Sequence, residues 1–204
     1  MALITVSNNS LTAVTALPAS IPTGALTLIK SITASSSASI SFVDGASGVV
    51  LDDTYKSYIF KFINIHPASS SKLTVGFRDG GTDYDATKTN TIVNVQHDEA
   101  NSYAEMAYAA NDDLAQSTAF ASLTAGSTGT DNDSNLSGYL QLFSPADTTF
   151  AKHFIVAVNH SAGAATNYSF MAGYCNVTAA IDAVQFKMSS SNIDSGIIKL
   201  YGVL

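Results

Sequence analysis

The amino-acid sequence predicts an all-β protein, an antiparallel two-sheet β-sandwich that is jelly-roll-like and carries an extended N-terminal arm. About ten short runs alternate apolar and polar residues as half-buried strands do, and clusters of Gly, Asp, Asn and Ser separate them. No strand–helix–strand unit is recognisable among them, which favours antiparallel sheets. Because 204 residues, 46% of them apolar, suffice for one core, we expect an arm over residues 1–24 and one β-sandwich domain over residues 25–204.

The expected arm lacks any stable apolar period. Pro18 and Pro22 disfavour regular structure in it. Fully extended, such an arm reaches roughly 80 Å. A disordered tail and an arm docked on a neighbouring subunit are the two alternatives, and spaced apolar residues favour docking. These residues are Leu11, Val14, Leu17 and Ile21.

The first strands of the domain are expected at Leu26–Ile32, Ala38–Val43 and Val49–Leu51, as antiparallel neighbours. Turn residues at Asp44-Gly45 and Ser47-Gly48 separate the last two of these runs. Their alternation of apolar and small polar residues is typical of strands with one buried face.

The run Tyr55–Ile65 has the strongest strand pattern in the chain. Aromatic residues alternate along one face and isoleucines along the other, so we expect a central strand covered on both sides. The dipeptide His66-Pro67 ends it, because proline cannot donate to a β-ladder. The aromatic face consists of Tyr58, Phe60 and Phe62, and the aliphatic face of Ile59, Ile63 and Ile65.

The remaining strands are expected as a meander, beginning with Lys72–Arg78 and Thr91–Val95. Residues 98–124 are predicted as a short helix or an irregular excursion, and Gly126–Gly138 as a long polar loop. A jelly roll is the simplest sandwich for this pattern, whereas an immunoglobulin-like sandwich is disfavoured by the length and by the absence of Trp. The later strands are Tyr139–Phe143, His153–Val158, Tyr168–Tyr174, Ile181–Met188 and Ser190–Gly202.

Charge and hydropathy exclude several classes of partner. Only 12% of the residues are charged, about half the usual share, and a surface of small polar residues suits packing against copies of the same chain. The net charge of -7, with nine scattered Lys and Arg, argues against nucleic acid and against anionic membranes. The first residues lack the features of a signal peptide, and no apolar run reaches the ~18 residues of a membrane span. We therefore expect a protein made and kept soluble in a cytoplasm, from which assembly can later carry it outside a cell.

Candidate metal and acid–base residues are incomplete. Asp131–Asn135 begins like a calcium loop, but Leu136 occupies the glycine position and Leu142 the position of the bidentate Glu. The triplet His97–Glu99 offers an acid and a base, although such triplets are usually exposed strand ends. The sequence thus predicts no metal, cofactor or catalytic site. The aspartates Asp79, Asp83 and Asp85 lack partners, and His66, His97, His153 and His160 lack metal-ligand spacing.

The remaining candidate functional residues are the single cysteine and three tyrosines near polar loops. Cys175 lies in an apolar run and is expected to be a small buried hydrophobe. Tyr84, Tyr103 and Tyr108 are candidates for a sugar-binding platform. Neither a nucleophile elbow nor a phosphate-binding loop occurs, so we expect a protein that is not an enzyme.

Five segments carry a resemblance to a known family. The chain from Gly24 onwards resembles tailed-bacteriophage virion structural proteins, many of them from marine phages. The resemblance implies a non-enzymatic virion component with a β-sandwich body, and no functional site residue follows from it. The segments are Gly24–Lys30, Thr33–Phe42, Asp53–Pro67, Phe150–Phe154 and Ser195–Gly202.

Two placements in a virion are open. A short arm followed by one compact body favours a capsid decoration or cement protein, a homotrimer bound to the major capsid protein or to other virion proteins. The alternative is a tail-fibre or tail-tip protein that binds host glycans through loops such as Gly126–Gly138 and Ser161–Asn167. The absence of a long repetitive shaft favours decoration over a fibre.

Overall fold

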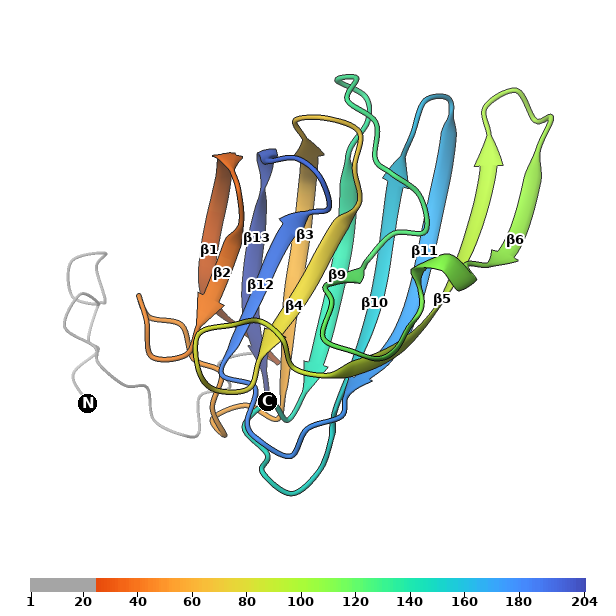
Figure 1. The fold of residues 1–204 in the computed structure, drawn as a ribbon. Coiled ribbons are helices and arrows are strands. Elements are labelled where there is room, and N and C mark those ends of the chain that lie inside the picture. The colour runs from red at the N-terminus through yellow and green to blue at the C-terminus, as the bar shows by residue number, and fades with distance from the viewer. Residues whose placement is uncertain (1–24) are drawn as a thin grey trace, which may run out of the picture.

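A computed structural model describes residues 25–204, and the expected arm, residues 1–24, lies outside the described residues. Within residues 25–204 the chain forms thirteen strands and one short 3-10 helix. The strands build two antiparallel sheets that pack face to face, as Figure 1 shows. The predicted all-β sandwich is confirmed.

The larger sheet has nine strands. Eight of them follow one another across the sheet, and β7 (Leu114–Ser117) pairs with the remaining length of β5. The eight, in spatial order, are β1 (Leu26–Ser37), β13 (Ile193–Val203), β3 (Ser57–Pro67), β9 (Leu136–Phe143), β10 (Lys152–Ser161), β11 (Ala165–Cys175), β5 (Lys88–Asp98) and β6 (Ala104–Tyr108).

The smaller sheet has four strands and lies over part of the larger one (Figure 1). Its strands cover one face of the larger sheet, while the β5–β6 hairpin extends beyond them. In spatial order they are β2 (Ile40–Val43), β12 (Ala183–Met188), β4 (Leu73–Arg78) and β8 (Ala121–Ser122).

Eight of the strands have jelly-roll connectivity. The row β1-β13-β3-β9 faces the row β2-β12-β4-β8. The chain crosses between them at β1–β2, β2–β3, β3–β4, β8–β9 and β12–β13, and from β9 to β12 by way of β10 and β11. Strands β5 to β7 are inserted between β4 and β8, and β10 and β11 between β9 and β12. These insertions widen only the larger sheet.

This connectivity corrects three sequence predictions. The strands at Leu26–Ile32 and Ala38–Val43 lie in opposite sheets and are not neighbours. The predicted meander is wrong for the same reason, since β4 leaves the sheet that holds β3 and β5. Val49–Leu51 forms no strand, and Val49 and Leu51 reach the core from a loop.

Strand β3 has the predicted aromatic core face but is not covered on both sides. Phe60 is fully buried, whereas Ile59 and Ile63 are half-buried on the outer face of the large sheet. Ile65 was expected beside them but points into the core, because Asn64 adopts a φ of 50° at a bulge that shifts the register.

A cluster of aromatic rings joins the two sheets. The Phe186 ring on β12 meets Phe60 and Phe62 on β3 edge-to-face, with centroids 5.3 and 5.1 Å apart. Phe42 on β2 completes the cluster, with its ring 5.3 Å from that of Phe60. Such pairs contribute about 0.5–1.5 kcal/mol each beyond their area burial, so this cluster fixes the packing of the smaller sheet.

Residues 98–124 are more regular than predicted. The expected helical face, Tyr103 to Leu114, is wrong because β6 and β7 both pair with β5. Only η1 (Ala110–Asp112), a single 3-10 turn, lies between these two strands. The polar loop predicted from Gly126 ends slightly early, since β9 begins at Leu136.

Replacing Gly138 with alanine is expected to lower the free energy of unfolding by about 2–3 kcal/mol. Gly138 has a φ of 153°, and a Cβ there would lie 2.3 Å from the carbonyl oxygen of Ala157 on β10. Gly163→Ala is the control, because its φ is 67° and no atom lies within 4 Å of the added Cβ. Urea unfolding should show a loss of about 1 kcal/mol for the control, and equal losses would contradict this account.

Candidate functional site

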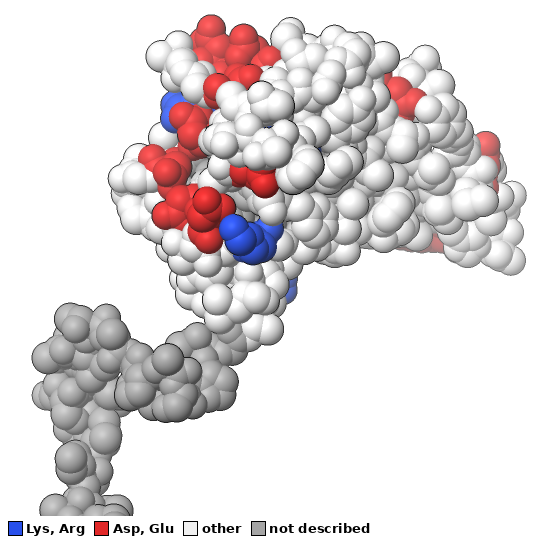
Figure 2. Space-filling model, turned by 90° about the horizontal axis from the view of Figure 1, so that it is seen from below, with Lys and Arg blue, Asp and Glu red and all other residues white. Residues whose placement is uncertain are grey.

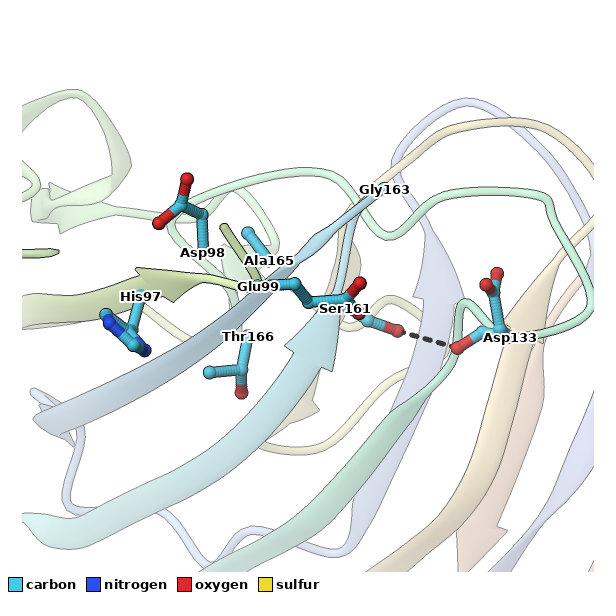
Figure 3. A pocket seen from close by; sticks show the side chains of 8 residues that line it. All are labelled: His97, Asp98, Glu99, Asp133, Ser161, Gly163, Ala165 and Thr166. Carbon is cyan, nitrogen blue, oxygen red and sulfur yellow. Dashed lines mark hydrogen bonds between the residues drawn. The ribbon is translucent and has the colours of Figure 1, made fainter. Parts of the chain in front are cut away.

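Three loops enclose an open hollow at the upper end of the sandwich, which Figure 3 shows from close by. They connect β5 to β6, β8 to β9 and β10 to β11, and the hollow has a volume of about 220 Å³. Three of the residues that line it are acidic and two carry hydroxyls. The lining residues are His97, Asp98, Glu99, Asp133, Ser161, Gly163, Ala165 and Thr166.

Ser161 holds two of these loops together. Its hydroxyl donates to the carbonyl oxygen of Asp133 at 3.0 Å and accepts from the Asn135 amide at 3.1 Å. Its carbonyl oxygen accepts from the Gly129 amide at 3.2 Å. The loops Gly126–Gly138 and Ser161–Asn167, both named from the sequence as glycan-contact candidates, therefore meet at one edge of the hollow.

The triplet His97–Glu99 does not converge into an acid–base pair. His97 and Asp98 point to opposite faces of β5 (Figure 3), as successive strand residues must. Asp98 accepts the backbone amides of Ser102 and Tyr103, both at 2.9 Å, in the β5–β6 turn. Hydrogen bonds from the Ser102 hydroxyl and amide lower the pKa of Asp98, so this carboxylate is occupied in holding the turn.

The calcium-like loop at Asp131–Asn135 forms a turn whose aspartates face solvent. Its Ser134 amide donates to the Asp131 carbonyl oxygen at 2.8 Å. Leu136 and Leu142 lie in β9 and are fully buried in the core. Among residues 25–204, no group of three or more His, Cys, Asp or Glu side chains is placed to hold a metal ion.

The opposite end of the sandwich is acidic. Its loops connect β2 to β3, β4 to β5, β9 to β10 and β11 to β12, and Figure 2 shows acidic side chains gathered there. One of them, Asp182, is paired with Arg78 at 2.8 Å. The aspartates Asp79, Asp83 and Asp85, singled out from the sequence, belong to this end. The loops also carry Asp44, Asp52, Asp53 and Asp147.

The four histidines and the three candidate tyrosines lie in separate places. His66 approaches Asp194 at 3.7 Å, and the His153 ring lies 5.9 Å from that of Tyr174, with the two planes inclined at 44°. Tyr103 and Tyr108 lie on opposite faces of the β5–β6 hairpin, by the register of β6. Tyr84 lies in the β4–β5 loop at the other end of the sandwich, so the structure brings no sugar-binding platform together.

Two buried lysines flank Cys175, an arrangement that the sequence analysis missed. Lys152, Cys175 and Lys88 are paired across β10, β11 and β5, and all three are at most 1% exposed. The Lys152 ammonium donates to the carbonyl oxygens of Val177, Thr178 and Ala179 at 3.1, 2.9 and 2.5 Å. Burial lowers the pKa of both lysines and raises the pKa of Cys175 to about 12. Cys175 is therefore an unreactive thiol at neutral pH.

Lys88 clamps a second loop in the same manner. Its ammonium donates to the carbonyl oxygens of Thr118 at 3.3 Å and Ala119 at 2.7 Å. Each lysine thus satisfies backbone acceptors of an irregular segment that no strand pairs with. These lysines have a structural role, because their donors are directed at backbone oxygens.

A buried polar group without partners lies beneath the β8–β9 loop. Both ring nitrogens of His160 are buried and unpaired, and so are the hydroxyls of Thr128 and Ser134. Burial, with a smaller contribution from Lys72, lowers the pKa of His160 to about 4. His160 is therefore neutral at physiological pH.

The outer face of the large sheet, which the smaller sheet does not cover, is apolar over much of its area. One row across the strands reads Leu28, Tyr201, Ile59, Gln141, Ile155, Ala172 and Thr91. Next to Ala172 lies a second hollow, of about 320 Å³, with His153 and Tyr174 on its wall.

Comparisons with protein-family models, with curated proteins and with solved structures find no match for this chain. None of the helices in the described part of the chain is long and apolar enough to cross a membrane. The functional interpretation therefore depends on the residues and on the geometry.

Proposed function

We propose that this chain is a non-enzymatic structural protein of a tailed-bacteriophage virion, a capsid decoration or cement protein. In this proposal, residues 1–24 bind the capsid shell or a sister subunit, and the sandwich forms a trimer on the head surface. The observation that carries the proposal is the broad apolar outer face of the large sheet, which suits a subunit that acts by packing.

The segments that resemble phage virion proteins support this proposal. Four of the five fall largely in strands β1, β2, β3 and β13, and three of these, β1, β13 and β3, are adjacent in the large sheet. Phe42 and Phe60, from two of the segments, pack ring against ring. The fifth segment contains the buried Lys152. Every one of these roles is architectural, in keeping with a family of structural subunits.

Deleting residues 1–24 is expected to abolish incorporation into phage heads while the body stays folded. The apolar residues of the arm supply contacts to the shell that the sandwich alone lacks. Complementation of a phage lacking the gene, followed by mass spectrometry of purified particles, measures incorporation, and circular dichroism checks the fold. Normal incorporation of the truncated protein would contradict the proposed role of the arm.

A tail-fibre or tail-tip protein that binds host glycans is the second candidate. One observation favours it: the loops Gly126–Gly138 and Ser161–Asn167 meet at a hollow lined by carboxylates and hydroxyls, groups that bind sugar hydroxyls. Copy number separates the candidates. Hundreds of copies per particle support decoration of the head, and a few dozen or fewer support a place in the tail.

A further inference from the structure

We infer that the outer face of the nine-stranded sheet is the surface through which each copy of this chain packs against a second copy, as the subunits of the proposed trimer would. Its densest apolar part lies on β11, β5 and β6, and we call it the Phe170 patch. The patch consists of Val93, Val95, Met106, Tyr108, Tyr168 and Phe170.

Register places these six side chains on one face. Phe170 pairs with Val93, which pairs with Tyr108 on β6. The next outward row pairs Tyr168 with Val95 and Val95 with Met106. The exposed fractions are 47% for Phe170, 60% for Tyr108 and 75% for Met106, although the side chains are apolar or aromatic. A contiguous exposed patch of six apolar or aromatic side chains is typical of an interaction surface.

The β5–β6 hairpin gives a second reason for a partner. Four of the five residues of β6 are exposed, and the hairpin extends beyond the smaller sheet (Figure 1). Strand β6 is the edge of the large sheet, pairs with β5 alone, and lies under no strand of the smaller sheet. A second subunit packed on the outer face supplies the missing cover.

Charge favours a second copy of this chain as the occupant. The protein has a net charge of -7, so two copies repel each other over most orientations. Within the described residues, none of the paired outward positions of the large sheet is Asp or Glu. The charged side chains among them are Lys61 and Lys199, and Lys61 lies over the Tyr201 ring at 5.5 Å. The carboxylates nearest to the face lie at its margins, where Asp113 accepts from the Tyr108 hydroxyl and Asp194 lies beside His66, so most of the face brings no carboxylates together.

The size of the face is sufficient for a stable association. Eight strands about 4.8 Å apart, each about ten residues long at about 3.3 Å per residue, give a footprint on the order of 1,100 Å². A standard stable interface needs about 800 Å² from each partner. The inference adds to the proposed function the surface by which the structural subunits assemble. It rests on the proposed function only in taking the chain to be a structural subunit.

The test is the oligomeric state of the full chain, measured by light scattering and sedimentation at micromolar concentration. We expect an oligomer of defined size, which Phe170→Arg dissociates by raising the dissociation constant about thirty-fold or more. Phe150→Arg is the matched control, because Phe150 is 70% exposed in the β9–β10 loop, away from this face. A monomeric wild type, or equal effects of the two variants, would overturn the inference.

A second measurement does not depend on how the variant folds. Met106 in the wild-type oligomer should be oxidised by hydrogen peroxide several-fold more slowly than after dilution to the monomer, and an unchanged rate would overturn the inference. If deletion of residues 1–24 produces monomers while the Phe170→Arg variant stays oligomeric, the arm and not the outer face is responsible for association. If the protein is a monomer in solution and is still incorporated into heads, the proposed association surface is wrong and the proposed function stands. If it is an oligomer but is absent from particles, the association surface stands and the proposed function is wrong.

Discussion

Lys152→Met is expected to lower the free energy of unfolding by about 3–5 kcal/mol. The three N–H donors of the ammonium match three carbonyl acceptors, those of residues 177, 178 and 179. Methionine fills a similar volume but donates nothing, so these oxygens lose their partner in a site that is 1% exposed. An unsatisfied buried acceptor costs about 1–3 kcal/mol, and the β11–β12 segment cannot turn all three towards water without unfolding locally.

The measurement is urea unfolding at neutral pH, with Lys56→Met as the matched control. Lys56 makes an ion pair with Asp53 at 3.0 Å, but its side chain is 76% exposed. Exposed pairs contribute little, so the control should lose less than about 1 kcal/mol. If both variants lose the same amount, Lys152 does not hold this segment as the structure indicates.

The face pattern of the strands was predictable from the sequence, but their partners were not. Alternation in Tyr55–Ile65 identifies which side chains enter the core, and Phe60 and Phe62 lie there as expected. The same alternation contains no information on which strand lies alongside, because most of the jelly-roll connections carry the chain to the other sheet. The Asn64 bulge was equally hidden, since asparagine in a strand does not by itself indicate a positive φ.

The buried lysines show why part of the site was missed. A lysine in an alternating run is expected to face solvent, and Lys88 and Lys152 face the core. Their acceptors lie on distant irregular segments, some 25–27 residues further along the chain for Lys152. Only the folded chain brings such acceptors to the ammonium, so local spacing gives no signal.

The candidate hollow was partly predictable. Polar composition identified Gly126–Gly138 and Ser161–Asn167 as exposed loops, and the structure adds that Ser161 joins them. The Phe170 patch did leave a signal in the sequence. In Tyr168–Tyr174, aromatic residues occupy alternate positions while Met171 occupies the other face, a pattern of a strand with two apolar faces.

Acidification from pH 7 to pH 4 is expected to cost about 3 kcal/mol of stability through His160 alone. Its pKa is about 4 in the folded protein, whereas an exposed histidine has a pKa of about 6.5, so between these values the unfolded chain binds a proton that the folded chain excludes. Stability through this group is therefore complete above pH 6.5, falls as the pH is lowered towards 4, and changes no further below that. The physical cause is the burial of both unpaired ring nitrogens, reinforced by the nearby charge of Lys72.

Urea unfolding of wild type and His160→Leu at pH 7 and pH 4.5, at one protein concentration, measures this effect. Leucine does not titrate, so the variant should lose about 2–3 kcal/mol less than the wild type between the two pH values. Hydrogen bonds in the folded state lower the pKa values of Asp52, Asp98 and Asp147. The stability that these carboxylates contribute is lost on acidification in both proteins alike. A variant at His160 with the wild-type pH dependence would show that this histidine is hydrated in solution and able to accept a proton without opening the β8–β9 loop.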